Sequence, residues 1–146
     1  MRKLNLILNL FIAVLAIAFC YVAYLVFWPV KVADYNQPYK VRPNIVEAGQ
    51  TLTYTTNYCK YIDVPPTVSR TLIDGTVIYF PTETTNLPTG CNKKDVQLVI
   101  PKNTPPGVYH IEITLTYKVN PLKEVTSRIL TDEFRVTNVC LTEKGC

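Results

Sequence analysis

The sequence predicts an all-β fold, an antiparallel β-sandwich, preceded by one N-terminal transmembrane helix. Three observations lead to this prediction. A long apolar run fills residues 4–30. After it, Thr, Val, Ile and Tyr are abundant, and turn residues recur about every 8–12 residues, as in sandwiches. No apolar repeat near 3.6 residues follows the run, so no second helix is expected.

The apolar run begins at Leu4 and continues to Trp28. Residues 10–28 contain no charge, glycine or proline. At about 1.5 Å per residue, a helix of that length crosses most of a roughly 30 Å hydrocarbon layer. Trp28 suits an aromatic belt, and Pro29 stands where a helix should end. We therefore expect residues 1–30 to form a short cytoplasmic N-terminus and a membrane anchor that contacts the bilayer from Leu4 to Trp28.

The charges beside the run indicate its orientation. Arg2 and Lys3 precede it, and Lys31 follows it. Positive residues stay on the cytoplasmic side, so the C-terminal part is expected in the periplasm or outside the cell. A cleaved signal peptide is the alternative, because residues 16–18 (Ala-Ile-Ala) resemble a cleavage site. The apolar run, however, continues well beyond them.

The cysteines also favour an exported domain. Cys20 lies in the apolar run, and four follow it: Cys59, Cys91, Cys140 and Cys146. Four cysteines in a small exported domain indicate two disulfides. We favour Cys59–Cys91 and Cys140–Cys146, because the last two are near neighbours, and the other pairings stay open. A zinc site is the competing use, but no CxxC motif is present and the sequence has a single histidine.

The first part of the domain contains edge-like strands. Residues 31–40 are expected to be a juxtamembrane linker, followed by a β-domain over residues 41–138. A first strand is predicted near residues 41–46, where Pro43 suits a sheet edge. A second covers residues 50–58, and its alternate side chains form a core face: Leu52, Tyr54, Thr56 and Tyr58.

A hairpin is predicted next. Two apolar runs, residues 67–73 and 76–80, flank Asp74-Gly75. An Asp-Gly pair between such runs is a strong hairpin signal, because both central residues of a type I′ turn need positive φ. Residues 81–94 are expected to form a polar loop, followed by a short strand over residues 95–100.

Residues 108–119 give the clearest strand signal. Apolar side chains occupy alternate positions, so one face should be core and the other wet: Tyr109, Ile111, Ile113, Leu115, Tyr117 and Val119. Residues 125–130 are expected to pair back onto it. One face of residues 125–130 falls at odd positions, whereas Phe134 falls at an even position. A bulge or bend near residues 131–132 is therefore expected to restore the register. Residues 139–146 form a cysteine-containing tail.

One local motif resembles immunoglobulin-like domains. The stretch 106–111 (PGVYHI) is similar to their tyrosine corner, which has a Gly, a spacer and a Tyr at the start of strand F. The resemblance implies an immunoglobulin-like antiparallel sandwich with Gly107 and Tyr109 as a structural corner. Ile111 stands where antibody-type domains have their second core cysteine. A Cys59–Cys91 bridge would therefore staple loops rather than pin the core.

Catalytic and metal-binding patterns are sparse. His110 is alone on the wet face of its strand, and no phosphate-binding, nucleophile or zinc-protease motif occurs. Asp132-Glu133 suits a solvated strand end better than a calcium site. All 11 acidic residues and all but two of the 15 basic residues follow the apolar run. This near balance disfavours nucleic acid as a partner. We expect no enzyme activity, cofactor or metal.

The expected function is therefore binding. Sandwich loops cluster at the ends of the fold, so Tyr61, Asp74 and Gly75 are the candidate partner contacts. We expect a single-span envelope protein, bacterial or phage-encoded, that presents an immunoglobulin-like domain for protein–protein contact outside the cytoplasm. The alternative is a structural or accessory subunit of a larger membrane assembly, whose helix packs against other spans. The sequence leaves the partner and the oligomeric state open.

Overall fold

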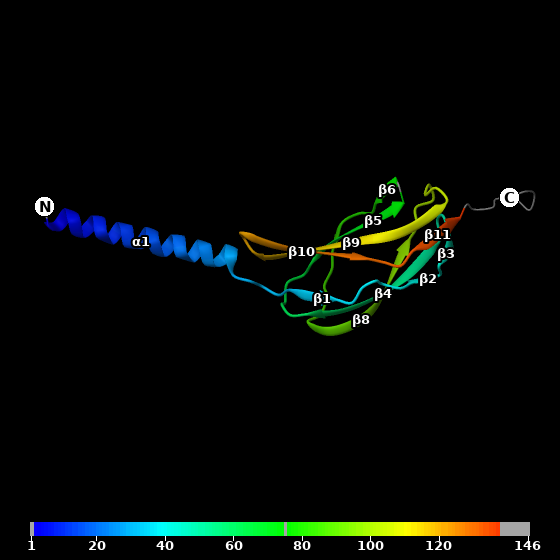
Figure 1. The fold of residues 1–146 in the computed structure, drawn as a ribbon, viewed down its shortest axis with the longest axis horizontal. Helices are drawn as coiled ribbons and strands as arrows, with labels where there is room; N and C mark the ends of the chain where they lie inside the picture. Colours follow the sequence, from blue (N-terminus) through cyan, green and yellow to red (C-terminus); the bar gives the residue numbers. More distant parts are fainter. Residues whose placement is uncertain (1, 75, 138–146) are drawn as a thin grey trace, which may run out of the picture.

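A computed structural model describes residues 2–74 and 76–137. The chain is mostly β-sheet with one N-terminal helix (Figure 1). In chain order, the elements are α1 (Arg2–Phe27), β1 (Ala33–Tyr35), β2 (Val41–Arg42), β3 (Ile45–Glu47), β4 (Thr51–Lys60), β5 (Thr67–Asp74), β6 (Thr76–Tyr79), β7 (Glu83–Thr84), β8 (Gly90–Val99), β9 (Gly107–Asn120), β10 (Lys123–Leu130) and β11 (Phe134–Thr137).

Helix α1 is long and apolar enough to span a membrane. Its 21 residues Ile7–Phe27 have a mean hydropathy of 2.7, and none is buried by the rest of the chain. The helix projects away from the sheets (Figure 1). It ends two residues before Pro29, as expected for a residue that cannot continue a helix.

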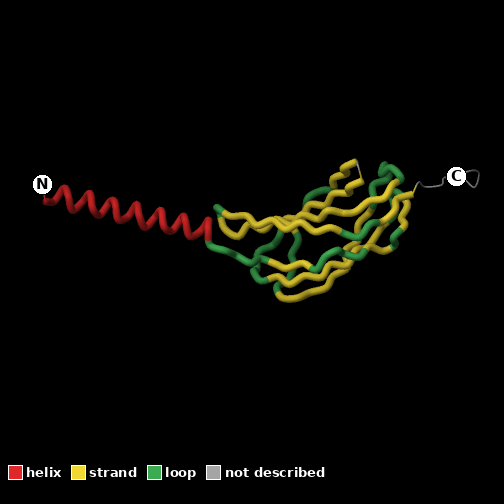
Figure 2. Tube along the Cα trace, viewed as in Figure 1, coloured by secondary structure: helices red, strands yellow, loops and turns green. Residues whose placement is uncertain are grey.

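The strands form two sheets, drawn as two yellow layers in Figure 2. In the first, β4 is central, β8 pairs with one edge, and β1 and β2 share the other. In the second, β9 is central, β5 pairs with one edge, and β10 and β11 share the other. β6 and β7 extend the second sheet beyond β5, and β3 pairs with β11.

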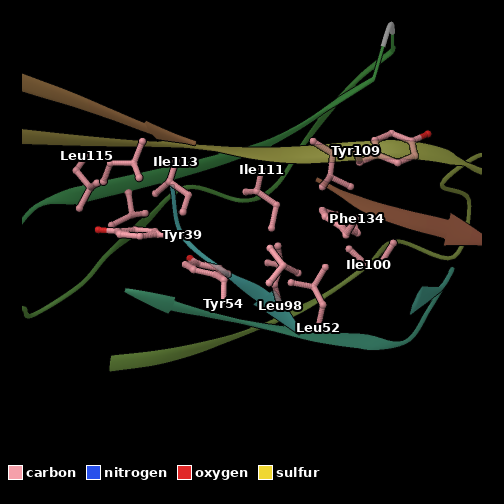
Figure 3. Close-up of a cluster of buried hydrophobic side chains, with 14 of the residues drawn as sticks. Tyr39, Leu52, Tyr54, Leu98, Ile100, Tyr109, Ile111, Ile113, Leu115 and Phe134 are labelled. Atoms are coloured by element: carbon pink, nitrogen blue, oxygen red, sulfur yellow. The ribbon is translucent and has the colours of Figure 1, made fainter. Parts of the chain in front are cut away.

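The core lies between the sheets, and β9 supplies its largest share. The predicted alternation is confirmed, because five inward side chains are at most 4% exposed: Tyr109, Ile111, Ile113, Leu115 and Tyr117. Figure 3 shows Leu52, Tyr54 and Leu98 of the first sheet directed toward them. The predicted hairpin is present, since β5 and β6 pair antiparallel, but Asp74 pairs with Thr76 and is the last residue of β5 rather than a central residue of a two-residue turn. Gly75 lies outside the described residues.

The linker predicted over residues 31–40 is wrong, because the domain begins within it. β1 pairs with the end of β4. Tyr39 is 2% exposed, and its backbone hydrogen-bonds Leu130 and Asp132 of the second sheet. The segment therefore closes one side of the two-sheet core. Only Val32 and Tyr39 are fully buried in it, and two inward residues in a polar stretch give too weak a pattern to mark a strand.

The strand predicted near residues 41–46 is divided in two. β2 joins the first sheet, whereas β3 joins the second. The chain crosses between the sheets at Pro43 and Asn44. Pro43 has no N–H to donate to a ladder, so the break occurs where pairing would be lost.

The strand expected to begin at residue 95 is longer, and β8 begins at Gly90. Most of its side chains are exposed, so its sequence lacks the alternation of apolar and polar residues by which a half-buried strand is predicted. Cys59 and Cys91 are direct neighbours on β4 and β8 and form a disulfide. This pairing agrees with the expectation, but the bond joins adjacent strands of one sheet rather than loops. Cys140 and Cys146 lie outside the described residues.

The predicted irregularity at residues 131–132 is present. β10 and β11 both pair with β9, and Thr131 lies in the gap between them. The Thr131 Oγ1 accepts a 2.9 Å hydrogen bond from the Ile111 N–H. A side-chain oxygen thus maintains the β9 ladder where the register changes. Phe134 and Val136 are thereby directed inward and are buried.

Tyr109 connects the start of β9 to the preceding loop. Its hydroxyl donates a 2.9 Å hydrogen bond to the Pro105 carbonyl, and its ring is 1% exposed. A side chain on Gly107 would collide with the Asp74 carboxylate and crowd the Tyr109 ring. This close approach explains why a glycine precedes the tyrosine.

We expect Tyr109→Phe to lower the free energy of unfolding by about 1–2 kcal/mol, because the Pro105 carbonyl loses its donor while the ring keeps its packing. Chemical denaturation of the full chain in detergent measures this change. Tyr79→Phe is the matched control, since Tyr79 is 78% exposed. Equal stability of the two variants would show that Tyr109 acts only as an apolar ring.

Candidate functional site

A cavity of about 350 Å³ lies between the two sheets. Tyr35 and Tyr39 line it on one side, and it extends to the side where residues of β8 and of β7 line it. The chain crosses this side between residues 85 and 89, and Leu87 and Val96 line the cavity there. The Lys60 ammonium is buried and donates a 2.5 Å hydrogen bond to the Leu87 carbonyl, which holds the crossing in place.

Tyrosines form one wall of the cavity, and aliphatic side chains form the other. The first sheet and the segment before it provide the aromatic wall: Tyr35, Tyr39, Tyr54 and Tyr58. The second sheet provides the aliphatic wall: Val68, Ile113, Leu115 and Ile129. These residues are inward-facing positions of their strands, so the cavity is a part of the core that the side chains do not fill.

Hydrogen bonds hold the hydroxyls of two of these four tyrosines, Tyr35 and Tyr54. The Tyr35 and Tyr117 hydroxyls hydrogen-bond each other. The Tyr54 hydroxyl accepts a 2.7 Å hydrogen bond from Arg70 Nε. The Tyr39 hydroxyl is buried and without a partner among the described residues. Because buried polar groups are nearly always paired, this hydroxyl is the exceptional atom of the cavity.

Arg70 places a charge in the cavity wall. Its Nη1 lies 2.6 Å from a Glu83 carboxylate oxygen, and its side chain is about 10% exposed. Burial opposes the charge, but the contacts with Tyr54 and Glu83 outweigh it, so the pKa of Arg70 is raised. Burial also raises the pKa of Tyr39 and, together with the Tyr117 hydrogen bond, that of Tyr35. The tyrosines therefore stay neutral and can donate.

The middle of β8, residues 94–97, lines the cavity. Among the described strands, β8 pairs only with β4, so the backbone groups on its other edge are free. A shallow groove crosses the outer face of the same sheet, and its basic lining residues are Lys40, Arg42 and Lys93. The nearby Asp95 carboxylate already accepts a 2.7 Å hydrogen bond from Thr55 Oγ1. This face is therefore basic.

The structure does not bring the predicted partner contacts together. The Tyr61 N–H bonds Val32 next to α1, and its hydroxyl donates a 2.6 Å hydrogen bond to Asp34. Lys31 lies over its ring, 4.9 Å from the centroid. Asp74 is at the β5–β6 tip, at the far end of the domain (Figure 1). The two are separated by nearly the whole length of β9, about 45 Å at roughly 3.3 Å per residue.

His110 and the acidic residues lie apart from the cavity, except for Glu83 and Asp95. His110 is on the outer side of β9, opposite Ile73. Within residues 2–74 and 76–137, no group of three or more His, Cys, Asp or Glu side chains is placed to hold a metal ion. The sequence assigned Tyr54 and Tyr58 to the core but Tyr35 and Tyr39 to the linker, and it did not predict the partly polar cavity that these four tyrosines line.

Comparisons with known proteins leave the family open. No family model matches the chain, and no curated protein matches it in sequence. Three solved structures are similar in part. The first is the alkylpurine DNA glycosylase AlkC of Pseudomonas fluorescens, bound to DNA with an abasic site analog (13% identity, TM-score 0.46, 74% of this chain and 31% of that chain).

The second is the sporulation control protein Spo0M of Bacillus subtilis (9% identity, TM-score 0.44, 73% of this chain and 50% of that chain). The third is the CARDB domain of the PF1109 protein of Pyrococcus furiosus, in complex with di-metal ions (17% identity, TM-score 0.40, 75% of this chain and 96% of that chain). The chain thus spans a third to a half of the first two proteins. Likenesses this low assign neither family nor activity.

We expect Tyr54→Phe and Tyr39→Phe to differ in their effect on stability. Tyr54→Phe removes an acceptor from a buried guanidinium and should cost about 1.5–3 kcal/mol. Tyr39→Phe removes a hydroxyl without a partner, so the free energy of unfolding should stay equal or rise. Denaturant titration of both variants measures the difference. A loss of stability in Tyr39→Phe as large as that in Tyr54→Phe would show that the Tyr39 hydroxyl is bonded.

Proposed function

We propose that this chain is a single-span membrane protein that presents an immunoglobulin-like sandwich on the outer side of a membrane and acts by protein–protein contact. The apolar, unburied helix α1 supports the membrane anchor. The immunoglobulin-like assignment is supported by the two facing sheets and by the hydrogen bond from the Tyr109 hydroxyl to the carbonyl of Pro105, which precedes it in the chain.

The disulfide and the flanking charges support an outward-facing domain. The Cys59–Cys91 bond fits an oxidising compartment. Arg2 and Lys3 precede the helix, which favours a cytoplasmic N-terminus. Asn120 and Lys123 donate hydrogen bonds to the Leu25 and Trp28 carbonyls at the end of α1. These contacts satisfy helix-end carbonyls and hold the β9–β10 hairpin against the anchor.

The free edge of β8 is the observation that carries the proposed contact. An unpaired strand edge offers N–H and C=O groups that an extended segment of another protein can pair with. Lys93 of β8, together with Lys40 and Arg42 on the other side of β4, makes the outer face of this sheet basic and favours an acidic segment. We therefore propose that an acidic, extended segment of a partner protein adds to β8 as a further strand.

We expect an alkaline phosphatase domain fused after Cys146 to be active in a bacterial host, because this enzyme needs the disulfides that form outside the cytoplasm. The same enzyme fused before Met1 should be inactive and serves as the control. Activity of the N-terminal fusion alone would reverse the proposed topology. Release of the domain from the membrane fraction would indicate a cleaved signal peptide.

We expect a photoreactive amino acid at Gln97 of β8 to crosslink a partner in the native host, whereas one at Tyr79, on the exposed β6, should not. Peptide mapping of the adduct should identify an acidic, extended segment. Lys93→Glu should abolish the crosslink because the charge is reversed beside the edge. Lys118→Glu is the matched control, since Lys118 is exposed on the other sheet.

Two results would contradict the proposed contact. If Lys93→Glu left the Gln97 crosslink unchanged, the basic face would not select the partner. If a partner were captured only from positions in α1, packing of the helix against other spans in a larger assembly would be the function instead.

A further inference from the structure

We propose that the cavity between the two sheets binds an uncharged, mainly apolar small molecule that offers an oxygen acceptor to the Tyr39 hydroxyl. This ligand site adjoins the proposed protein contact at the β8 edge, because β8 residues such as Lys94 and Val96 line the cavity. The proposal depends on the size of the cavity, the fixed position of its unpartnered hydroxyl, and the balance of charge in its wall.

The cavity has the size and lining of a small-molecule site. Its volume, about 350 Å³, lies within the range of about 300–1,000 Å³ typical of ligand pockets. Such pockets have mainly apolar walls and a few convergent polar groups. Here aliphatic and aromatic side chains supply the walls, and Leu87 and Val96 are part of the lining on the β8 side.

The Tyr39 hydroxyl is held in place rather than free to turn toward solvent. The Tyr39 backbone is fixed by hydrogen bonds to Leu130 and Asp132. Its ring stacks on Tyr54, with centroids 6.4 Å apart and planes 11° apart. A buried hydroxyl without a partner is unfavourable, so an acceptor that enters the cavity gains a hydrogen bond that the protein itself leaves unmade.

The charges in the wall favour an uncharged ligand. Arg70 is already paired with Glu83 and hydrogen-bonded to Tyr54, so it has no uncompensated charge. An anion would be desolvated beside the Glu83 carboxylate, and a cation beside the Arg70 guanidinium. Lys94 and Asp95 at the rim also have opposite signs. A neutral molecule with a carbonyl or ether oxygen meets neither penalty.

Photolabelling with benzophenone, an uncharged aromatic ketone, tests the proposal on the full chain in lipid nanodiscs. We expect saturable adducts in the peptides that contain Tyr54 and Ile113, located by peptide mapping. Val96→Trp should fill part of the cavity with its larger ring and abolish these adducts. Val99→Trp is the matched control, because Val99 is 59% exposed and does not line the cavity. Adducts in α1 from lipid-dissolved ketone should appear in every variant.

The Tyr39 hydroxyl and the ligand charge are tested in the same assay. Tyr39→Phe should raise the half-saturating concentration about three- to ten-fold, the equivalent of one net hydrogen bond. The anion 4-benzoylbenzoate should label the cavity peptides at least ten-fold less at equal free concentration. Non-saturable labelling, or full labelling of Val96→Trp, would overturn the proposal.

Three further outcomes would also count against it. If Tyr39→Phe left the half-saturating concentration unchanged, the ligand would not accept a hydrogen bond from the Tyr39 hydroxyl. Equal labelling by the anion would reject the uncharged class. If benzophenone failed to label the cavity while Val96→Trp abolished the β8 crosslink, the cavity would be a pocket for a side chain of the protein partner rather than a ligand site.

Discussion

The two-residue alternation of β9 is the constraint on which the rest of the structure depends. Its five inward side chains are nearly fully buried, and both of its edges are paired. A shift of one residue would turn all five toward water, so the register is strongly fixed. Because β9 runs the length of the domain, this register also places Gly107 against Asp74 at one end. At the other end it places Asn120 against the helix carbonyls.

The sequence predicted those elements whose burial pattern is local. β4, β9 and the β5–β6 hairpin each show their alternation or turn within a few residues, and the structure confirms them. β1 and the first half of β8 were missed because their pairing depends on distant segments. Tyr39 is buried only because residues about ninety positions later lie beside it. No local pattern records such a contact.

The candidate site was missed for a related reason. The sequence has ten tyrosines and five phenylalanines. Core positions were predicted for the strand tyrosines, such as Tyr54, but not for Tyr35 and Tyr39, and no hydroxyl was given a specific partner inside the core. Tyr54 pairs with Arg70, and Tyr35 pairs with Tyr117. Phenylalanine in place of Tyr54 would leave Arg70 Nε without its acceptor. The excess of tyrosine was therefore the available signal for a polar feature inside the core, but only the structure shows that Tyr39 lacks a partner.

The two proposed sites share residues, so their occupancies are linked. Lys94 and Val96 belong to β8 and also line the cavity. A strand added to the outer edge of β8 would extend the first sheet past the cavity. If that strand lowers or raises the affinity of the cavity for its ligand, the ligand changes the affinity of β8 for the strand by the same factor, because binding free energies around a cycle must sum to zero. The edge and the cavity would therefore act as one coupled unit only where the added strand changes the affinity of the cavity for its ligand.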